Sequence, residues 1–180
     1  ARVAVSPKYQ AKVFTSSARG DTGTSFGWVN YEAISSDSLD PHMNAYGGEN
    51  RFWLGPEGGQ YSIFFPPDSP FTFQNWKTPS PIDHEPWQLS SSGPTSATMS
   101  KEMNIANYKG YNLKIEAKRK VSLLTRVAIE DKLEVDLPES VNHVGYKTSN
   151  RIINLNDYAW TRETGTVCIW MLDMFVPSSR

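Results

Sequence analysis

A strict two-residue alternation runs through residues 111–124 and constrains the fold more than any other feature of this chain. Successive side chains of a β-strand point to opposite faces, so this period predicts one long strand. One face is apolar except for Arg119, and the other face is charged. A strand with one buried and one wet face is typical of an antiparallel sheet. The apolar positions are Leu113, Ile115, Ala117, Val121 and Leu123, and the charged positions are Lys114, Glu116, Lys118 and Lys120.

Shorter apolar segments on both sides of this strand predict further strands. Residues 166–175 are the most apolar and are expected at the centre of a sheet. Residues 51–54 and 60–65 flank turn-forming residues 55–59, which predicts a hairpin. A short helix is expected only near residues 126–135. Together the patterns predict an all-β fold, an antiparallel β-sandwich, with further strands at 3–5, 11–15, 26–31, 96–103 and 141–154.

Composition and charge narrow the class of function. The 180 residues suit one domain. A formal net charge of −1 gives no electrostatic case for binding nucleic acid or an anionic membrane surface. No segment approaches the roughly 20 apolar residues of a membrane span. The one cysteine, Cys168, excludes an intramolecular disulfide, and no glycine-rich phosphate-binding motif is present, so no cofactor is expected.

Residues 46–61 combine five glycines with aromatic and charged side chains. Flat apolar faces beside directional polar groups suit a sugar-sized ligand. Arg51 lies in this segment between Asn50 and two aromatic residues, which would desolvate it. Because a buried guanidinium must be paired, Glu49 or Glu57 is expected beside it. The sequence leaves two roles open for Arg51, a ligand-binding group and a structural pin.

Carboxylates elsewhere in the chain offer two weaker candidates. Asp83 and Glu85 flank His84, and in an extended segment their side chains would share one face, roughly 6–7 Å apart. Such a pair could hold a cation with help from other segments, although a solvated loop is the favoured interpretation. Glu163 follows Arg162 just before the apolar segment 166–175. It could act as an acid or base in a site, or form a surface ion pair.

Several motifs along nearly the whole chain resemble a family of uncharacterised bacterial envelope proteins. They are residues 47–65, Pro79-Ser-Pro-Ile-Asp83, Asn107-Tyr108, residues 160–165 and Ile169-Trp-Met-Leu172. The resemblance implies a fold similar to the galactose mutarotase β-supersandwich. Residues 1–180 would then be one domain and the N-terminal half to two-thirds of a larger supersandwich. It also implies a periplasmic or extracellular location, and that the rest of the chain or a second copy covers an exposed sheet.

The resemblance further implies a carbohydrate-binding or carbohydrate-processing function. Asn50-Arg51 resembles the Asn-Arg pair that orients the sugar in mutarotases, and Glu163 stands near the place of their catalytic histidine. The catalytic base would lie beyond residue 180, so enzyme activity stays open. The alternative is a non-catalytic structural or interaction protein of the envelope. The ligand-binding candidates are Glu49, Asn50, Arg51, Trp53, Glu57 and Trp76, with Trp53 or Trp76 stacking on a sugar ring.

Overall fold

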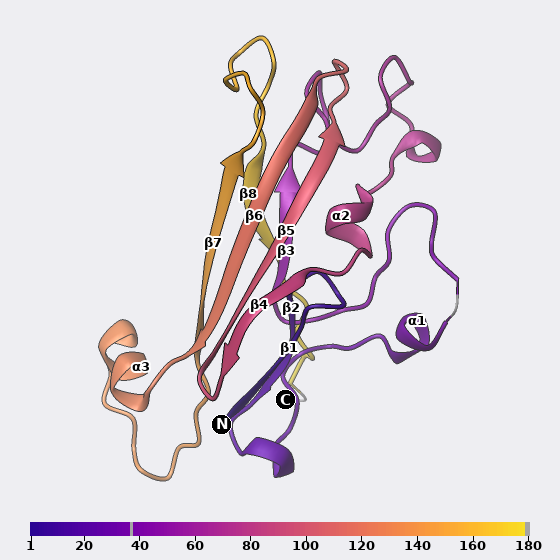
Figure 1. Cartoon of the computed structure of the whole chain (residues 1–180). Helices are drawn as coiled ribbons and strands as arrows, with labels where there is room; N and C mark the ends of the chain where they lie inside the picture. The colour runs from indigo at the N-terminus through magenta and orange to yellow at the C-terminus, as the bar shows by residue number, and fades with distance from the viewer. Residues whose placement is uncertain (37, 179–180) are drawn as a thin grey trace.

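A computed structural model describes residues 1–36 and 38–178 and consists mainly of antiparallel strands (Figure 1). The largest sheet has four strands, which follow one another in space as they do along the chain. Each neighbouring pair is antiparallel, so the sheet is a meander. Its strands are β4 (Gln88–Gly93), β5 (Ser96–Ala106), β6 (Asn112–Leu123) and β7 (Tyr146–Asn154).

Two pairs of strands complete the β-structure. β1 (Arg2–Ser6) pairs with β2 (Lys12–Ser17), and β3 (Arg51–Gly55) pairs with β8 (Cys168–Leu172). The core contains side chains of β2 and β3 together with those of β5 and β6, so the small sheets pack on one face of the large sheet (Figure 1). The prediction of an all-β, antiparallel and sandwich-like architecture is therefore confirmed.

The alternation in residues 111–124 predicted β6 correctly. Leu113, Ile115, Ala117 and Val121 are at most 3% exposed, whereas the lysines of the opposite face are exposed. Burial of these side chains removes apolar surface from water, which stabilises the sheet by about 25 cal/mol for each Å². Arg119 shares the inner face and is also completely buried.

The helices are short. α3 (Arg126–Leu133) confirms the helix expected near residues 126–135, and the Thr125 side chain caps it by accepting a hydrogen bond from the Ala128 N–H. Four single-turn elements were not predicted, because they are too short to show a helical period. They are α1 (Tyr31–Ser35), α2 (Ser80–Asp83) and the 3₁₀ turns η1 (Gly20–Thr22) and η2 (Phe73–Asn75). Among the described residues, no helix has the length and apolar character needed to span a membrane.

The predicted hairpin around residues 55–59 was wrong. β3 pairs instead with β8, and Trp53 lies opposite Trp170. Residues 60–65 form turns in which the Ser62 N–H donates to the Gly59 carbonyl and the Ile63 N–H to the Pro56 carbonyl. All five residues of β3 are buried, and the strand takes an apolar partner from a distant part of the chain. Local turn chemistry carries no information about such a pairing.

Three other strand predictions need correction, and one strand was missed. Residues 166–175 are not central, because β8 belongs to a two-stranded sheet. Residues 26–31 form two isolated bridges, Gly27 with Phe175 and Val29 with Gly47, instead of a strand. β7 begins only at Tyr146, five residues later than expected. β4 was missed because all six of its residues are exposed and leave no apolar pattern.

Candidate functional site

Three consecutive side chains, two just before β3 and one at its first residue, lie in three separate polar environments. Glu49, Asn50 and Arg51 are 1%, 9% and 2% exposed. Alternation along an extended chain turns Asn50 to the face opposite Arg51. Glu49 lies in the bend before the strand and contacts Ser16 instead. The residues selected from the sequence are therefore buried, and distant segments supply their contacts.

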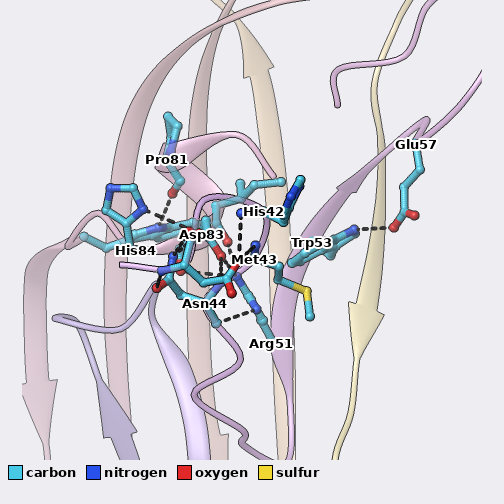
Figure 2. Close-up of polar contacts among 12 residues, drawn as sticks. His42, Met43, Asn44, Arg51, Trp53, Glu57, Pro81, Asp83 and His84 are labelled. Carbon is cyan, nitrogen blue, oxygen red and sulfur yellow. Dashed lines mark hydrogen bonds and ion pairs between the residues drawn. The ribbon is translucent and has the colours of Figure 1, made fainter. Parts of the chain in front are cut away.

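Arg51 is paired with Asp83 of α2 (Figure 2). Its Nη2 donates to Asp83 Oδ1 at 3.0 Å and to the Ile82 carbonyl at 2.9 Å. The Asn44 N–H donates to the same carboxylate at 2.8 Å. Burial lowers the pKa of Arg51, while the charge of Asp83 acts in the opposite direction. The partner expected from the sequence, Glu49 or Glu57, was wrong, and the arrangement corresponds to a structural pin between β3 and α2.

The Asp83-His84-Glu85 cluster does not converge on one point. The Asp83 carboxylate faces Arg51, and the Glu85 carboxylate accepts a hydrogen bond from Lys101 Nζ at 2.6 Å. His84 Nδ1 lies 3.5 Å from Asp83 Oδ2. Over residues 1–36 and 38–178, no three His, Cys, Asp or Glu residues are grouped so that they could hold a metal ion.

The two candidate tryptophans pack against other side chains of the core and the loop that follows it. The guanidinium of Arg51 lies over Trp53, 4.5 Å from its ring centroid, and the ring of Phe64 stacks on Trp53 at 5.6 Å. Trp76 is nearly parallel to Phe64, at 5.5 Å between ring centroids, and to Phe73, at 6.3 Å. Both rings therefore already stack on groups of the protein itself.

The remaining candidate carboxylates are Glu57 and Glu163. Glu57 Oε1 accepts a hydrogen bond from Trp53 Nε1 at 2.9 Å (Figure 2). Glu163 lies on an exposed loop, where its backbone N–H donates to Thr161 Oγ1. Its expected ion pair with Arg162 is not formed in the described part of the chain.

Asn50 connects β3 to the large sheet through Arg119. The buried guanidinium of Arg119 donates to the Asn50 carbonyl and side-chain oxygen, to the Ala11 carbonyl at 2.9 Å and to Asn150 Oδ1 at 2.8 Å. Asn50 Nδ2 in turn donates to Asp173 Oδ1 at 2.9 Å. Burial lowers the pKa of Arg119 to about 10. Arg119 was visible in the sequence as the one charged residue on an apolar strand face.

Glu49 forms part of the wall of a cavity of about 560 Å³. Its Oε1 accepts a hydrogen bond from the Ser16 N–H at 2.5 Å, whereas Oε2 is buried and has no hydrogen-bond partner in the described structure. Tyr146 lies beside it. Burial, and then the negative charge of Glu49, raise the pKa of the Tyr146 phenol.

The rest of the cavity combines apolar walls with two more polar groups. It lies between α3, with the segment that follows this helix, and the side of β2; Figure 1 shows α3 set apart from β2 and the C-terminal segment. Phe26 and Phe175 are 44% and 56% exposed at its edge, and Ile129 of α3 is buried. His143 Nδ1 is buried without a partner among the described residues. The cavity therefore brings together a carboxylate, a phenol, an imidazole and two accessible aromatic rings.

Sequence reasoning found Glu49 but not the groups that share its cavity. His143 and Tyr146 lie almost one hundred residues later in the chain, and no spacing rule connects them to Glu49. Their signal is weak, since each is a single polar residue in or beside a segment that was predicted as one strand. Phe26 and Phe175 are brought together by the bridge between Gly27 and Phe175.

The architecture and the site define an all-β protein with an antiparallel sandwich-like fold, a buried polar network around residues 49–51, and a cavity beside Glu49. The chain belongs to a family of unknown function, DUF6786, which it matches over residues 1–180. A search of curated proteins and a search of solved structures gave no match. Membership of an uncharacterised family was thus predicted correctly, while the likeness to galactose mutarotases stays a prediction.

Proposed function

We propose that this protein binds a carbohydrate in the cavity beside Glu49. The observation that carries the proposal is that a buried carboxylate with an unpaired oxygen shares one cavity with two exposed phenylalanine rings. Sugar rings have hydroxyl groups that donate hydrogen bonds and C–H faces that pack on aromatic rings. The cavity volume of about 560 Å³ is within the range usual for small-molecule sites.

Each polar group has a role in this proposal. Glu49 Oε2 accepts a hydrogen bond from a sugar hydroxyl, and the Tyr146 hydroxyl and His143 Nδ1 orient neighbouring hydroxyls. Asn50 and Arg51 act indirectly, because their bonds to Arg119 and Asp83 fix the backbone that carries Glu49. A carboxylate and an imidazole on one cavity are also suited to proton transfer, so processing of the bound sugar is the enzymatic form of the proposal.

The resemblance of the motifs supports two further parts of the proposal. They are a mutarotase-like form of the sandwich and a location in the periplasm or outside the cell. The resemblance also offers Glu163 as an acid or base. Glu163 lies on an exposed loop and does not line the Glu49 cavity. Substitution of Glu49 and substitution of Glu163 are therefore expected to affect sugar binding differently.

Isothermal titration against a panel of mono- and oligosaccharides tests the proposal. We expect one or more sugars to bind, and Glu49→Gln to weaken that binding by about tenfold or more, because a buried acceptor loses its charge. Glu163→Gln should leave the affinity unchanged. A loss confined to Glu163→Gln would move the site to that loop, and an absence of binding to the whole panel would refute the proposal.

One observation favours a second function, that of a structural or interaction protein of the envelope. Arg51 is buried and is bound by Asp83 and by backbone carbonyls, as expected of a structural pin. In that case no sugar binds, and Glu49→Gln alters only the free energy of unfolding. Chemical unfolding of the same variant, measured beside the titration, separates the two functions.

A further inference from the structure

We propose that the ligand of the Glu49 cavity carries a protonated amino group, which makes it an amino sugar with a free amine. The sugar part of this inference rests on the proposed function. The amine part rests on the surroundings of Glu49, and three observations support it.

The first observation is that Glu49 lacks a cationic partner. Glu49 and Asp83 are the two buried carboxylates of the described chain. Asp83 is paired with Arg51, whereas Glu49 forms no ion pair with any described residue and has one N–H donor, that of Ser16. A buried charge without a partner is costly. A hydroxyl group would satisfy only the hydrogen bond, whereas an ammonium group would supply both the hydrogen bonds and the missing charge.

The second observation is the charge around the cavity. Its described lining contains neither lysine nor arginine. Glu49 is the one carboxylate in that described lining. The aromatic faces of Phe26 and Phe175, which also line the cavity, attract cations.

The third observation is the set of acceptors. An ammonium group has three N–H donors. The cavity offers the unpaired Oε2 of Glu49, the hydroxyl oxygen of Tyr146 and the unpaired Nδ1 of His143, which accepts in the neutral tautomer protonated at Nε2. Three acceptors match the three N–H donors of an ammonium group. A sugar hydroxyl has one O–H donor and would satisfy only one of these acceptors.

Titration of the intact chain with three related sugars tests the inference. The probes are glucosamine, which has a free amine, N-acetylglucosamine, in which the amine is neutralised, and glucose, which has a hydroxyl in its place. We expect glucosamine to bind about tenfold or more tightly than the other two, as for a charge-assisted contact in a buried site. Glu49→Gln should abolish this preference, and the matched substitution Glu102→Gln on the exposed face of β5 should retain it.

The outcomes separate the inference from the proposed function. Equal affinity for the three sugars, or tighter binding of either neutral sugar, overturns the amine while leaving carbohydrate binding intact. Binding of none of the three, together with no binding to the wider panel, overturns both. The comparison of the three sugars uses the unchanged protein, so a Glu49→Gln variant that fails to fold does not remove the test.

Discussion

At the scale of single residues, Lys12 is the most unusual side chain. It is completely buried, and its Nζ has no hydrogen-bond partner in the described part of the chain. The rings of Phe14 and Tyr46 lie 5.3 and 5.4 Å from the amine. Burial, and then the positive charge of Arg51, lower the pKa of Lys12 to about 6, so the amine is mainly neutral at pH 7.

This lowered pKa makes stability depend on pH. Between about pH 6 and pH 10.5 the unfolded chain holds a proton on Lys12 that the folded chain does not, so the free energy of unfolding should rise as the pH rises through this window. Lys12→Met removes the cost of deprotonating the buried amine, which is about 1.4 kcal/mol for each pKa unit. The substitution should therefore increase the free energy of unfolding at pH 7 by a few kcal/mol. Urea unfolding at several pH values measures the effect. The exposed substitution Lys120→Met is the control, and an unchanged pH slope in Lys12→Met would contradict the assignment.

A second prediction concerns the pair formed by Arg51 and Asp83. Asp83→Ala leaves a buried guanidinium without a counter-charge, and we expect it to lower the free energy of unfolding by about 3–5 kcal/mol. Glu85 provides a matched control, because its carboxylate is paired with Lys101 but is 39% exposed. Glu85→Ala should cost under about 1 kcal/mol. Equal losses in the two variants would show that the buried pair is not a pin.

At the scale of secondary-structure elements, the segment at Gly27 packs closely against β2 and Glu49. A Cβ atom added to Gly27 would lie 2.0 Å from the Phe14 carbonyl oxygen and 3.0 Å from Glu49 Cγ. Gly27→Ala must therefore push the segment at residue 27 away from β2 and displace Glu49. We expect a loss of about 1–3 kcal/mol in the free energy of unfolding. We also expect weaker sugar binding.

Gly58→Ala is the control for this prediction, because nothing lies within 4 Å of a Cβ atom at that position. Thermal unfolding and titration of both variants make the comparison. Wild-type stability and affinity in Gly27→Ala would mean that the contact between residue 27 and Glu49 is looser than described.

The elements also show which sequence signals were sufficient. The period of two identified β6 because one of its faces is buried and the other is solvated. The same rule could not find β4, which is exposed on both faces. It also could not assign β8 as the partner of β3, because a continuously apolar strand does not specify which other strand it pairs with. Arg51 was expected to be paired, but its partner Asp83 depends on the position of α2, which the sequence did not reveal.

At the scale of the whole molecule, the cavity is assembled from segments spread over the chain. Ser16, Glu49, Ile129, Tyr146 and Phe175 all line it. The sequence could supply Glu49 as a candidate, but the cavity exists only once β2, α3 and the C-terminal segment are packed together. A ligand held by all of these segments binds the folded chain and not the unfolded one.

Ligand binding should therefore stabilise the whole fold. A sugar at about one hundred times its dissociation constant should raise the free energy of unfolding by about 2.7 kcal/mol. A melting curve followed by tryptophan fluorescence would show an increase in Tm that grows with sugar concentration. The increase should be absent in Glu49→Gln at the same concentrations. A sugar that binds in the titration without shifting Tm would contradict a site assembled from these segments.

The separate polar environments of Glu49, Asn50 and Arg51 have a consequence for how the sequence can vary in evolution. Each side chain has its own neighbours, namely Tyr146 for residue 49, Arg119 and Asp173 for residue 50, and Asn44 and Asp83 for residue 51. Adjacent positions should then vary independently of one another, while each varies together with its distant partners. If the cavity changed its ligand within the family, substitutions would accumulate at positions 49, 143 and 146 and leave the pairs 50 with 119 and 51 with 83 in place.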